Sequence, residues 1–523
     1  MSLFAGLDVS TQGCKIVIID SIKKAVVYLD SINYDKDLPH YSTRNGVVQG
    51  LGEGASESDP LMWIEAVESI FRNLQESEIQ QDAINCISVS GQQHGLVALD
   101  SAGNLTRQRS KLWNDFSTAK ECTLLTDAVG GREAMIKEVG NSQKTGYTAS
   151  KIYHMLRHEP DNYKKASTFF LVHNYVNWFL TGGIICMEPG DTSGMALWNP
   201  KTGKWSEKVI SAIDPRLPQK LPKIKPSNQS IGFISKSLVK KFGFSSECKI
   251  DAGSGDNMYG AIGTGNIKPG IVTVSLGTSG TACTFMKESH IDPSGEIAAF
   301  CDSTGNYLAL LCVSNLANGY NQFLKQHNLS HDRFSRLIKQ TRAGNSGRIL
   351  IPWFSGERTP DVPEASPFYF GFGLEDFTPD ILARAVLEGH ILNLSEGFQR
   401  LPVKPVEIRL TGGLAKSEVW QQAIADIFEA EVVPVEGEGA ALGAAVHAAW
   451  VWFMESGRKV SLEHLASQFV CPDESLRKKP CLENLITYRL QKRLFHSLTQ
   501  RLLKKEGENP FALQNKIKSH YEL

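Results

Sequence analysis

The sequence predicts an α/β protein built from two related lobes with a cleft between them. A strand–turn–strand pattern occurs once in each half of the chain, and in each half strands come first and covering helices follow. The length of 523 residues also exceeds what one hydrophobic core usually organises. We therefore expect at least two domains and a binding site at the cleft.

The two strand–turn–strand patterns share one chemical character. In the first, the strands Leu3 to Val9 and Lys15 to Asp20 flank the turn Ser10 to Gly13. In the second, Val272 to Leu276 leads into the turn Gly277-Thr278-Ser279 and a returning strand. Glycine and small hydroxyl residues leave backbone N–H groups accessible, which suits close approach by phosphate oxygens. Two such turns predict a duplicated domain that holds a polyphosphate from both sides.

The rest of the chain fits this division. It becomes helical from about Ser117, and the proline-dotted stretch 215–226 resembles a connector before new strands begin near Cys248. Further helices are expected over 377–401, 416–430 and 440–453, with short strands at 408–410 and 432–435. We expect domains at 1–248 and 249–457, followed by an extension at 458–523.

Lys and Arg outnumber Asp and Glu in the 458–523 extension. Leu490, Leu494, Leu498 and Leu502 recur every four residues, which predicts an amphipathic helix. Its basic face could recruit an acidic partner, but packing on the second domain with a solvated basic face is the favoured interpretation.

Composition excludes several classes of protein. The formal net charge of −1 favours neither nucleic acid nor an anionic membrane as a partner. The N-terminus lacks the pattern of a secretory signal, and the longest apolar stretch is too short to span a bilayer comfortably. Cysteines are scattered singly without a C-x-x-C pair, which indicates reduced thiols and a cytoplasmic location.

Asp256 is the candidate catalytic base. It lies among glycines in the segment Asp251 to Gly260, just after an expected strand. A carboxylate there can position an alcohol and accept its proton during phosphoryl transfer. Asp256 could instead cap the helix that begins near Met258, and the residues alone do not decide between these roles.

Asp8 raises a related question, because it directly precedes the first phosphate-type turn. A carboxylate would repel phosphates unless a cation lies between them, so this position implies Mg²⁺, bound through water. The alternative is a turn residue that bonds its own backbone.

Three further segments carry grouped polar residues. Gly91-Gln92-Gln93-His94-Gly95 ends an expected strand and suits recognition of a polyol such as a sugar, although a histidine there is more often a surface or capping residue. Trp113-Asn114-Asp115 adds an aromatic face and two polar groups. Gly412-Gly413-Leu414-Ala415-Lys416-Ser417 stands between a strand and a helix, where backbone can meet a nucleotide, unless it is an ordinary β-to-α turn.

With these motifs in this order, the chain resembles the FGGY family of carbohydrate kinases, within the actin/sugar-kinase/Hsp70 superfamily. The resemblance runs from Leu3 to about Trp450 and includes Ser355-Gly356-Glu357-Arg358-Thr359-Pro360. The P-loop, the dinucleotide-binding glycine motif and H-E-x-x-H are absent from the sequence. The resemblance implies two ribonuclease-H-like lobes that close over the cleft.

The resemblance also implies roles for individual residues. Asp256 would be the base that takes a proton from the terminal hydroxyl of a ketopentose, favoured as D-xylulose, while Asp8 with Mg²⁺ organises the phosphates of ATP. The remaining assignments are Thr11, Gly277, Thr278 and Ser279 for the phosphates, Gly412, Gly413, Leu414 and Ser417 for the nucleoside, and Gln93, His94, Asp256 and Asn257 for the sugar.

Alternatives remain open at this point. The acceptor could be another ketopentose, a deoxysugar or a polyol such as glycerol, and the family's usual tryptophan is replaced by His154 in a sugar-domain segment. A non-catalytic nucleotide-binding switch is a further alternative, against which the presence of both Asp8 and Asp256 argues. The family often dimerises, so a homodimer is possible.

Overall fold

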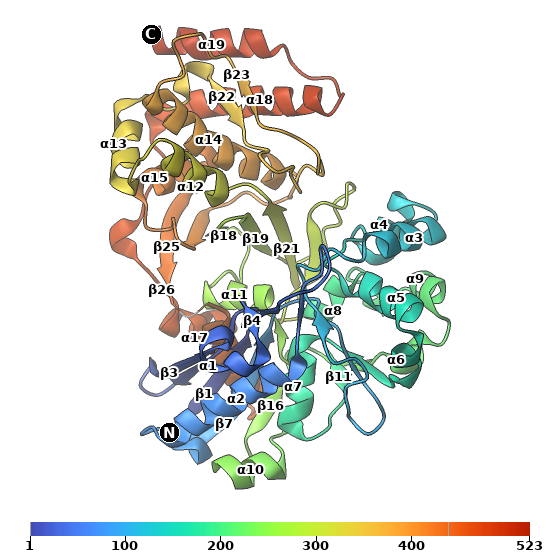
Figure 1. Ribbon diagram of the computed structural model, residues 1–523. Coiled ribbons are helices and arrows are strands. Elements are labelled where there is room, and N and C mark those ends of the chain that lie inside the picture. The colour runs from blue at the N-terminus through green and yellow to red at the C-terminus, as the bar shows by residue number, and fades with distance from the viewer. Residues whose placement is uncertain (1, 438, 523) are drawn as a thin grey trace. The chain divides into compact units, whose positions relative to one another are not determined.

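The computed structural model describes residues 2–437 and 439–522, and the chain forms two compact units (Figure 1). Unit 1 comprises Met1–Ile267, Phe285–Leu308 and Gly437–Cys471. Unit 2 comprises Lys268–Thr284, Ala309–Glu436 and Pro472–Leu523. Each unit is therefore assembled from separate stretches of the chain.

Unit 1 is built on a mixed sheet. Its strands in spatial order are β15 (Ser230–Phe233), β16 (Lys249–Asp251), β7 (Ile84–Gly91), β1 (Leu3–Val9), β2 (Gly13–Asp20) and β3 (Ala25–Asn33). β1 pairs antiparallel with β2 and parallel with β7, which in turn pairs parallel with β16. The carboxyl ends of β1 and β7 therefore meet at one edge of the sheet, where Asp8 pairs with Ser90.

Helices cover both faces of this sheet, and their bounds are α2 (Pro60–Gln75), α7 (Val172–Thr181), α10 (Lys236–Phe242), α11 (Asp256–Gly263), α16 (Gly439–Glu455) and α17 (Leu462–Phe469). Leu3, Ala5, Leu7 and Val9 alternate along β1 and pack in one core with Trp63 of α2. On the other face, a Cβ at Gly6 would lie 2.1 Å from the carbonyl oxygen of Ala441. Glycine at this position therefore permits the close approach of α16 to β1.

A second core in unit 1 is largely helical. It contains residues of α3 (Ala119–Val129), α4 (Arg132–Val139), α5 (Thr148–His158), α6 (Pro160–Lys165) and α9 (Glu207–Ile213), together with β8 (Val97–Leu99) and β10 (Thr168–Phe170). Ile152 of α5 and Leu125 of α3 are fully buried in it. This core positions the segment that follows β7.

Unit 2 repeats the strand order of unit 1. Its adjacent strands are β21 (Tyr307–Val313), β19 (Gly280–Met286), β18 (Ile271–Leu276), β24 (Glu407–Thr411) and β25 (Glu431–Glu436). β18 pairs antiparallel with β19 and parallel with β24, as β1 does with β2 and β7. The same order, β3-β2-β1-β7-β16, occurs in unit 1. The prediction of two related α/β lobes is confirmed.

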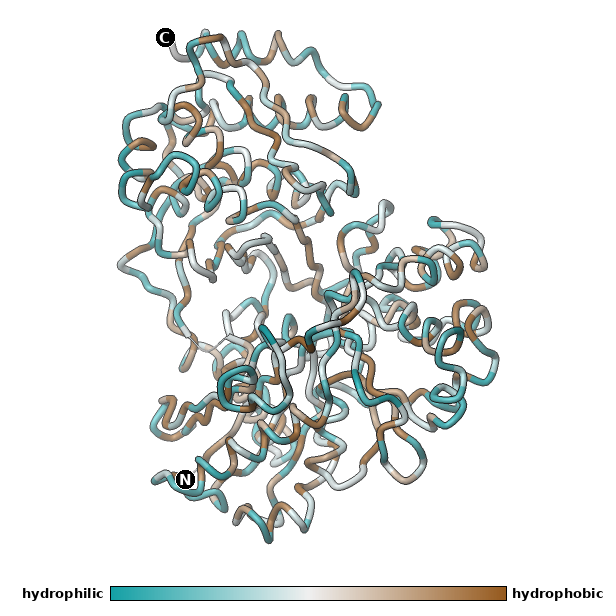
Figure 2. The backbone as a smooth tube through the Cα atoms, viewed as in Figure 1, coloured by the Kyte–Doolittle hydropathy of each residue, from teal (hydrophilic) through white to brown (hydrophobic). Residues whose placement is uncertain are grey.

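The helices of unit 2 are α12 (Ala317–Gln326), α13 (His331–Gln340), α14 (Pro379–Phe398), α15 (Glu418–Phe428), α18 (Leu482–Leu502) and α19 (Pro510–Glu522). α18 packs against α14 and α15, and hydrophilic and hydrophobic residues alternate along it (Figure 2). A helix is thus present over the predicted leucines, with Leu494 and Leu498 buried, Leu490 half-buried and Leu502 43% exposed. Among the described residues, no helix has the length and hydropathy needed to cross a membrane.

Candidate active site

Asp8 and Asp256 lie near the carboxyl ends of two strands in unit 1 that both pair with β7. Asp8 is the penultimate residue of β1, and Oγ of Ser90 donates a 2.7 Å hydrogen bond to its Oδ1. Asp256 begins α11 directly after β17 (Ser254–Gly255), which pairs parallel with the end of β7. The two carboxylates therefore belong to one group of side chains at this edge of the sheet.

The charge environment of these carboxylates is unusual. Burial raises the pKa of the Asp8 carboxyl, and the hydrogen bond from Ser90 and the charge of Lys15 oppose that rise. Burial and, after it, the negative charges of Asp8 and Asp191 raise the pKa of Asp256 from 3.8 to about 8. A carboxylate with a pKa near the working pH is suited to general base catalysis.

Asp256 is not the N-cap residue of its helix. Gly255 occupies the N-cap position of α11, where no side chain caps the helix, and Asp256 is the first helical residue. Oδ1 of Asp256 accepts a 2.9 Å hydrogen bond from the backbone N–H of the adjacent Asn257. Asp256 therefore lies inside the first turn and accepts one of its backbone N–H groups, without holding the N-cap position.

Gln93 and Asn257 connect the polar turn after β7 to α11. The side-chain amide of Asn257 donates a 2.6 Å hydrogen bond to Oε1 of Gln93. Nε2 of Gln93 in turn donates to Oδ1 of Asp191 at 3.3 Å. A Cβ at Gly255 would lie 2.6 Å from Cγ of Gln93, so glycine permits this close contact.

His94 is held in a restrained position beside Asp191. Its backbone is left-handed, with φ of 65°, and its carbonyl oxygen accepts hydrogen bonds from Nζ of Lys151 at 2.7 Å and from Oγ1 of Thr148 at 3.2 Å. Its ring packs edge-on against Tyr147, with ring centroids 4.8 Å apart. Burial lowers the pKa of His94 to about 4, so its imidazole is neutral near pH 7.

Two buried polar atoms in this group have no hydrogen-bond partner among the described residues. They are Nδ1 of His94, which lies 3.6 Å from Oδ1 of Asp191, and Oδ2 of Asp191, which lies 3.5 Å from Nδ1 of His173. Buried polar atoms in proteins are normally paired, so unpaired ones call for an explanation such as a ligand or a water molecule. This group is therefore a candidate site for a molecule that offers hydroxyl groups.

Asp191 is a site residue that the sequence did not predict. It lies in the short helix α8 (Pro189–Thr192), and its Oδ1 also accepts a 3.4 Å hydrogen bond from the backbone N–H of His94. The only sequence signal was one acidic residue within a glycine-containing segment. That signal is too common to identify a site, and the contact with His94 spans nearly a hundred residues of chain.

The first phosphate-type turn is tied to two other predicted segments. Oγ1 of Thr11 donates a 3.1 Å hydrogen bond to Oε1 of Gln92 and accepts one of 3.0 Å from Nε1 of Trp113. The side chain of Trp113 is 41% exposed, which leaves an aromatic face beside the turn. The structure thus brings together Thr11, the Gln-His turn and the Trp-Asn-Asp segment.

The second turn, in unit 2, is oriented by α12. The carbonyl oxygen of Gly277 accepts a hydrogen bond from the N–H of Ala317, and that of Thr278 accepts from the N–H groups of Leu316 and Asn318. In a trans peptide the N–H points opposite to the preceding carbonyl. The N–H groups of Thr278 and Ser279 therefore point away from α12, as an anion-binding turn requires.

The glycine pair after β24 lies beside this turn. Gly412 has φ of 89°, and a Cβ there would lie 2.8 Å from the carbonyl oxygen of Leu276. A Cβ at Gly413 would meet no described atom within 4 Å, so that side is open. Ser417 precedes α15 as its N-cap residue, and Leu414 is 7% exposed. All seven residues predicted for the nucleotide in the second half of the chain thus lie in unit 2.

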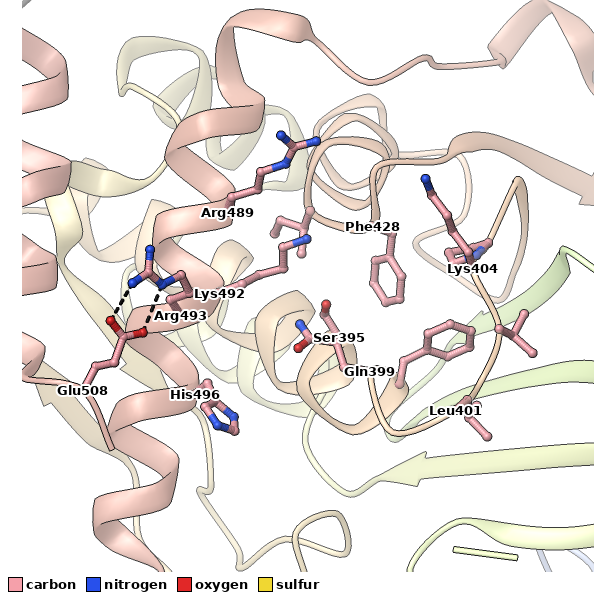
Figure 3. A pocket seen from close by; sticks show the side chains of 14 residues that line it. Ser395, Gln399, Leu401, Lys404, Phe428, Arg489, Lys492, Arg493, His496 and Glu508 are labelled. Carbon is pink, nitrogen blue, oxygen red and sulfur yellow. Dashed lines mark hydrogen bonds and ion pairs between the residues drawn. The ribbon is translucent and has the colours of Figure 1, made fainter. Parts of the chain in front are cut away.

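Unit 2 also contains a separate hollow of about 500 Å³ between α14 and α18 (Figure 3). Phe398 and Phe428 contribute apolar surface to it. Most of its positively charged side chains are paired with carboxylates. Arg489 and Lys492 form ion pairs with Glu429, and Arg493 forms one with Glu508. None of the predicted site residues line it.

Both halves of the chain match models of one protein family. The model of the N-terminal domain of the FGGY family of carbohydrate kinases matches residues 3–263, and that of its C-terminal domain matches residues 272–452. The chain belongs to the FGGY family of carbohydrate kinases. Its membership implies phosphotransfer from ATP to a carbohydrate.

Relatives and solved structures agree with this assignment. The chain is 34% identical to a xylulose kinase of Haemophilus influenzae over 93% of this chain and 97% of that protein. It superposes on a ligand-bound xylulose kinase from Lactobacillus acidophilus with a TM-score of 0.84 and 25% identity, covering 96% of this chain and 99% of that one. A gluconate kinase from Lactobacillus acidophilus gives a TM-score of 0.83 at 25% identity, covering 96% and 98%.

Proposed function

We propose that this FGGY kinase transfers the γ-phosphoryl group of ATP to the terminal hydroxyl of D-xylulose, with Asp256 as general base. The observation that carries the proposal is the hydrogen bond between Asn257 and Gln93, which joins the candidate base to the polyol-binding turn. The substrate follows the relative from Haemophilus influenzae, which is named a xylulose kinase and matches over nearly its whole length.

In this reaction the Asp256 carboxylate takes the proton of the sugar O–H as that oxygen attacks the γ-phosphorus. A new P–O bond forms, the bond between the γ-phosphorus and the bridging oxygen breaks, and ADP leaves with the bond's electrons. Gln93, His94 and Asn257 orient the sugar. This orientation matters because phosphoryl transfer depends on positioning the reactants more than on covalent intermediates. Thr11 is the proposed phosphate contact of the first turn, and Gly277, Thr278 and Ser279 are the proposed phosphate contacts of the second turn.

The carboxylates also fit a hard divalent cation. The negative charge of Asp8 is one cause of the raised pKa of Asp256, and carboxylate oxygens of this kind are donors that Mg²⁺ prefers. Asp8 would hold Mg²⁺ through water, and the bound ion would neutralise phosphate charge. Gly412, Gly413, Leu414 and Ser417 are the proposed contacts of the nucleoside.

The gluconate kinase with a similar fold raises a second candidate acceptor. Gluconate carries a carboxylate, whereas this site already contains Asp8, Asp191 and Asp256. Nearby Lys151 is fully buried and donates to the carbonyl oxygens of His94 and Gly146. The anionic surroundings therefore favour a neutral sugar over a sugar acid.

The test is a coupled assay of ADP release with MgATP and a panel of acceptors. The panel contains D-xylulose, L-xylulose, D-ribulose, L-ribulose, L-fuculose, glycerol, D-gluconate and no acceptor. A clear preference for D-xylulose in kcat/KM is expected. Preference for another acceptor would keep the phosphotransfer role and overturn the substrate, whereas no stimulation by any acceptor with ATP bound would favour a nucleotide-binding switch.

A further inference from the structure

A second group of ligand-type side chains lies in the helical part of unit 1. Glu121 comes from α3, and His154 and His158 come from α5. The two histidines are four residues apart on one helix, which places them on the same face. Their ring centroids are 4.4 Å apart. None of these residues belongs to the candidate active site.

The donor atoms of this group converge. One ligand atom from each of Glu121, His154 and His158 can be chosen so that all lie within 4.8 Å of one another. Nε2 of His158 is 3.2 Å from Oε1 of Glu121, whose residue is only 1% exposed. Nδ1 of His154 is buried without a hydrogen-bond partner among the described residues.

The protonation state suits a metal ligand. Burial lowers the pKa of His154, and the positive charge of Lys111 lowers it as well. The imidazole is therefore neutral near pH 7, which is the form that binds metals. Together with the unpaired Nδ1, this leaves His154 with a lone pair available for coordination.

We propose that Glu121, His154 and His158 form a binding site for a divalent transition metal of the Zn²⁺ class. Two imidazoles and one carboxylate are a donor set that Zn²⁺ accepts, with water as a fourth ligand. Imidazole donors also select Zn²⁺, Ni²⁺ and Cu²⁺ over Mg²⁺ and Ca²⁺. The site therefore differs in chemistry from the oxygen-donor group at Asp8.

The geometry needs a modest contraction to bind the ion. Zn–N and Zn–O bonds of about 2.0–2.2 Å place tetrahedral ligand atoms roughly 3.4 Å apart, so atoms that lie within 4.8 Å of one another need to approach by at most about 1.4 Å. His158 has a side chain that is 50% exposed, so it is free to rotate toward the ion. Arg157 donates to Oε1 of Glu121 at 2.6 Å, and a carboxylate has enough lone pairs to accept this hydrogen bond and still bind a metal.

A site of this kind would tie α3 to α5. α5 also carries Lys151, whose Nζ donates to the carbonyl oxygen of His94. The metal would therefore stabilise the helical part of unit 1 against unfolding, because an ion that binds only the native state shifts the equilibrium toward it.

The experiment measures Zn²⁺ binding to the full chain after removal of metals with a chelator and desalting. Isothermal titration is done with excess Mg²⁺, which occupies oxygen-donor sites, and Co²⁺ absorption in the visible range reports imidazole ligation. We expect one equivalent of Zn²⁺ and a higher Tm in its presence. In His158→Ala and His154→Ala the Kd should weaken by about tenfold or more.

A matched variant separates ligation from packing. Arg157→Gln removes the ion pair with Glu121 but keeps all three proposed ligands, so its Kd for Zn²⁺ should be unchanged or tighter. His158→Ala, at a half-exposed side chain, suffices if His154→Ala fails to fold. The proposal is overturned if the unaltered chain binds no Zn²⁺, if binding survives both histidine substitutions, or if Arg157→Gln weakens it equally.

Discussion

The side-chain amide of Asn257 donates a 2.6 Å hydrogen bond to Oε1 of Gln93. This contact joins α11, which begins with Asp256, to the turn that follows β7. The candidate base at the start of this helix is thereby fixed relative to the residues proposed to bind a polyol. Fixed geometry of this kind is what phosphoryl transfer requires, because little covalent chemistry is left to the protein.

Asp256→Asn is expected to lower kcat by roughly 10²–10⁴-fold, the usual contribution of a general base. The affinities for ATP and sugar should change little, because an amide is nearly isosteric with the carboxylate. The hydrogen bond from Asn257 to Gln93 should also be kept. Steady-state kinetics and titration of both substrates give the measurement. Asp332→Asn is the control, since Asp332 also lies in the first turn of a helix, α13, but is exposed. Near-normal kcat in Asp256→Asn would remove the base assignment.

The pH dependence of kcat/KM should show an acidic limb. Burial and the charges of Asp8 and Asp191 raise the pKa of Asp256 to about 8, and only the ionised form accepts a proton. Activity of the free enzyme should therefore rise with pH up to about 8 and fall about tenfold per pH unit well below it. Asp8→Asn removes one of the two negative charges that raise the pKa of Asp256. The acidic limb measured on the residual activity of this variant should therefore lie at lower pH. If the limb does not move, a group other than Asp256 causes it.

His94→Asn is expected to raise the KM for the sugar by up to roughly tenfold, the size of one lost hydrogen bond, and to change the KM for ATP little. Asparagine is the appropriate replacement because it tolerates the left-handed backbone that His94 adopts at φ of 65°. Because burial lowers the pKa of His94 to about 4, the sugar KM should not titrate between pH 6 and 8 through this residue. Equal effects on both KM values would make His94 a structural residue.

Much of the fold was predictable because the signals were local. The helices expected over 377–401, 416–430 and 440–453 correspond to α14, α15 and α16, each of which is rich in apolar residues over a length typical of a helix. The strand–turn–strand patterns correspond to β1–β2 and β18–β19, since short turns of small residues fix antiparallel pairing.

What escaped prediction depends on contacts between distant parts of the chain. α16 packs on β1 in unit 1 because Gly6 admits its backbone, although the two segments lie at opposite ends of the sequence. Asp191 reaches Gln93 from the short helix α8. Neither contact leaves a periodic pattern in the sequence, so spacing and composition contain no sign of it.

The last prediction concerns stability rather than rate. Asp256 has a raised pKa in the folded protein, so folding favours its protonated form. The contribution of Asp256 to the stability of the folded protein is complete below its ordinary pKa of 3.8 and is lost as the pH rises toward about 8. At the higher pH a partly buried negative charge must be held beside Asp8 and Asp191. Asp256→Asn is uncharged at every pH and escapes this loss. Its Tm relative to the unaltered chain should therefore increase between pH 4 and pH 8, as measured by thermal unfolding without ligands. Asp332→Asn should show no such trend, and a relative Tm that is constant or falls over this range would mean that Asp256 is ionised in the folded protein without cost.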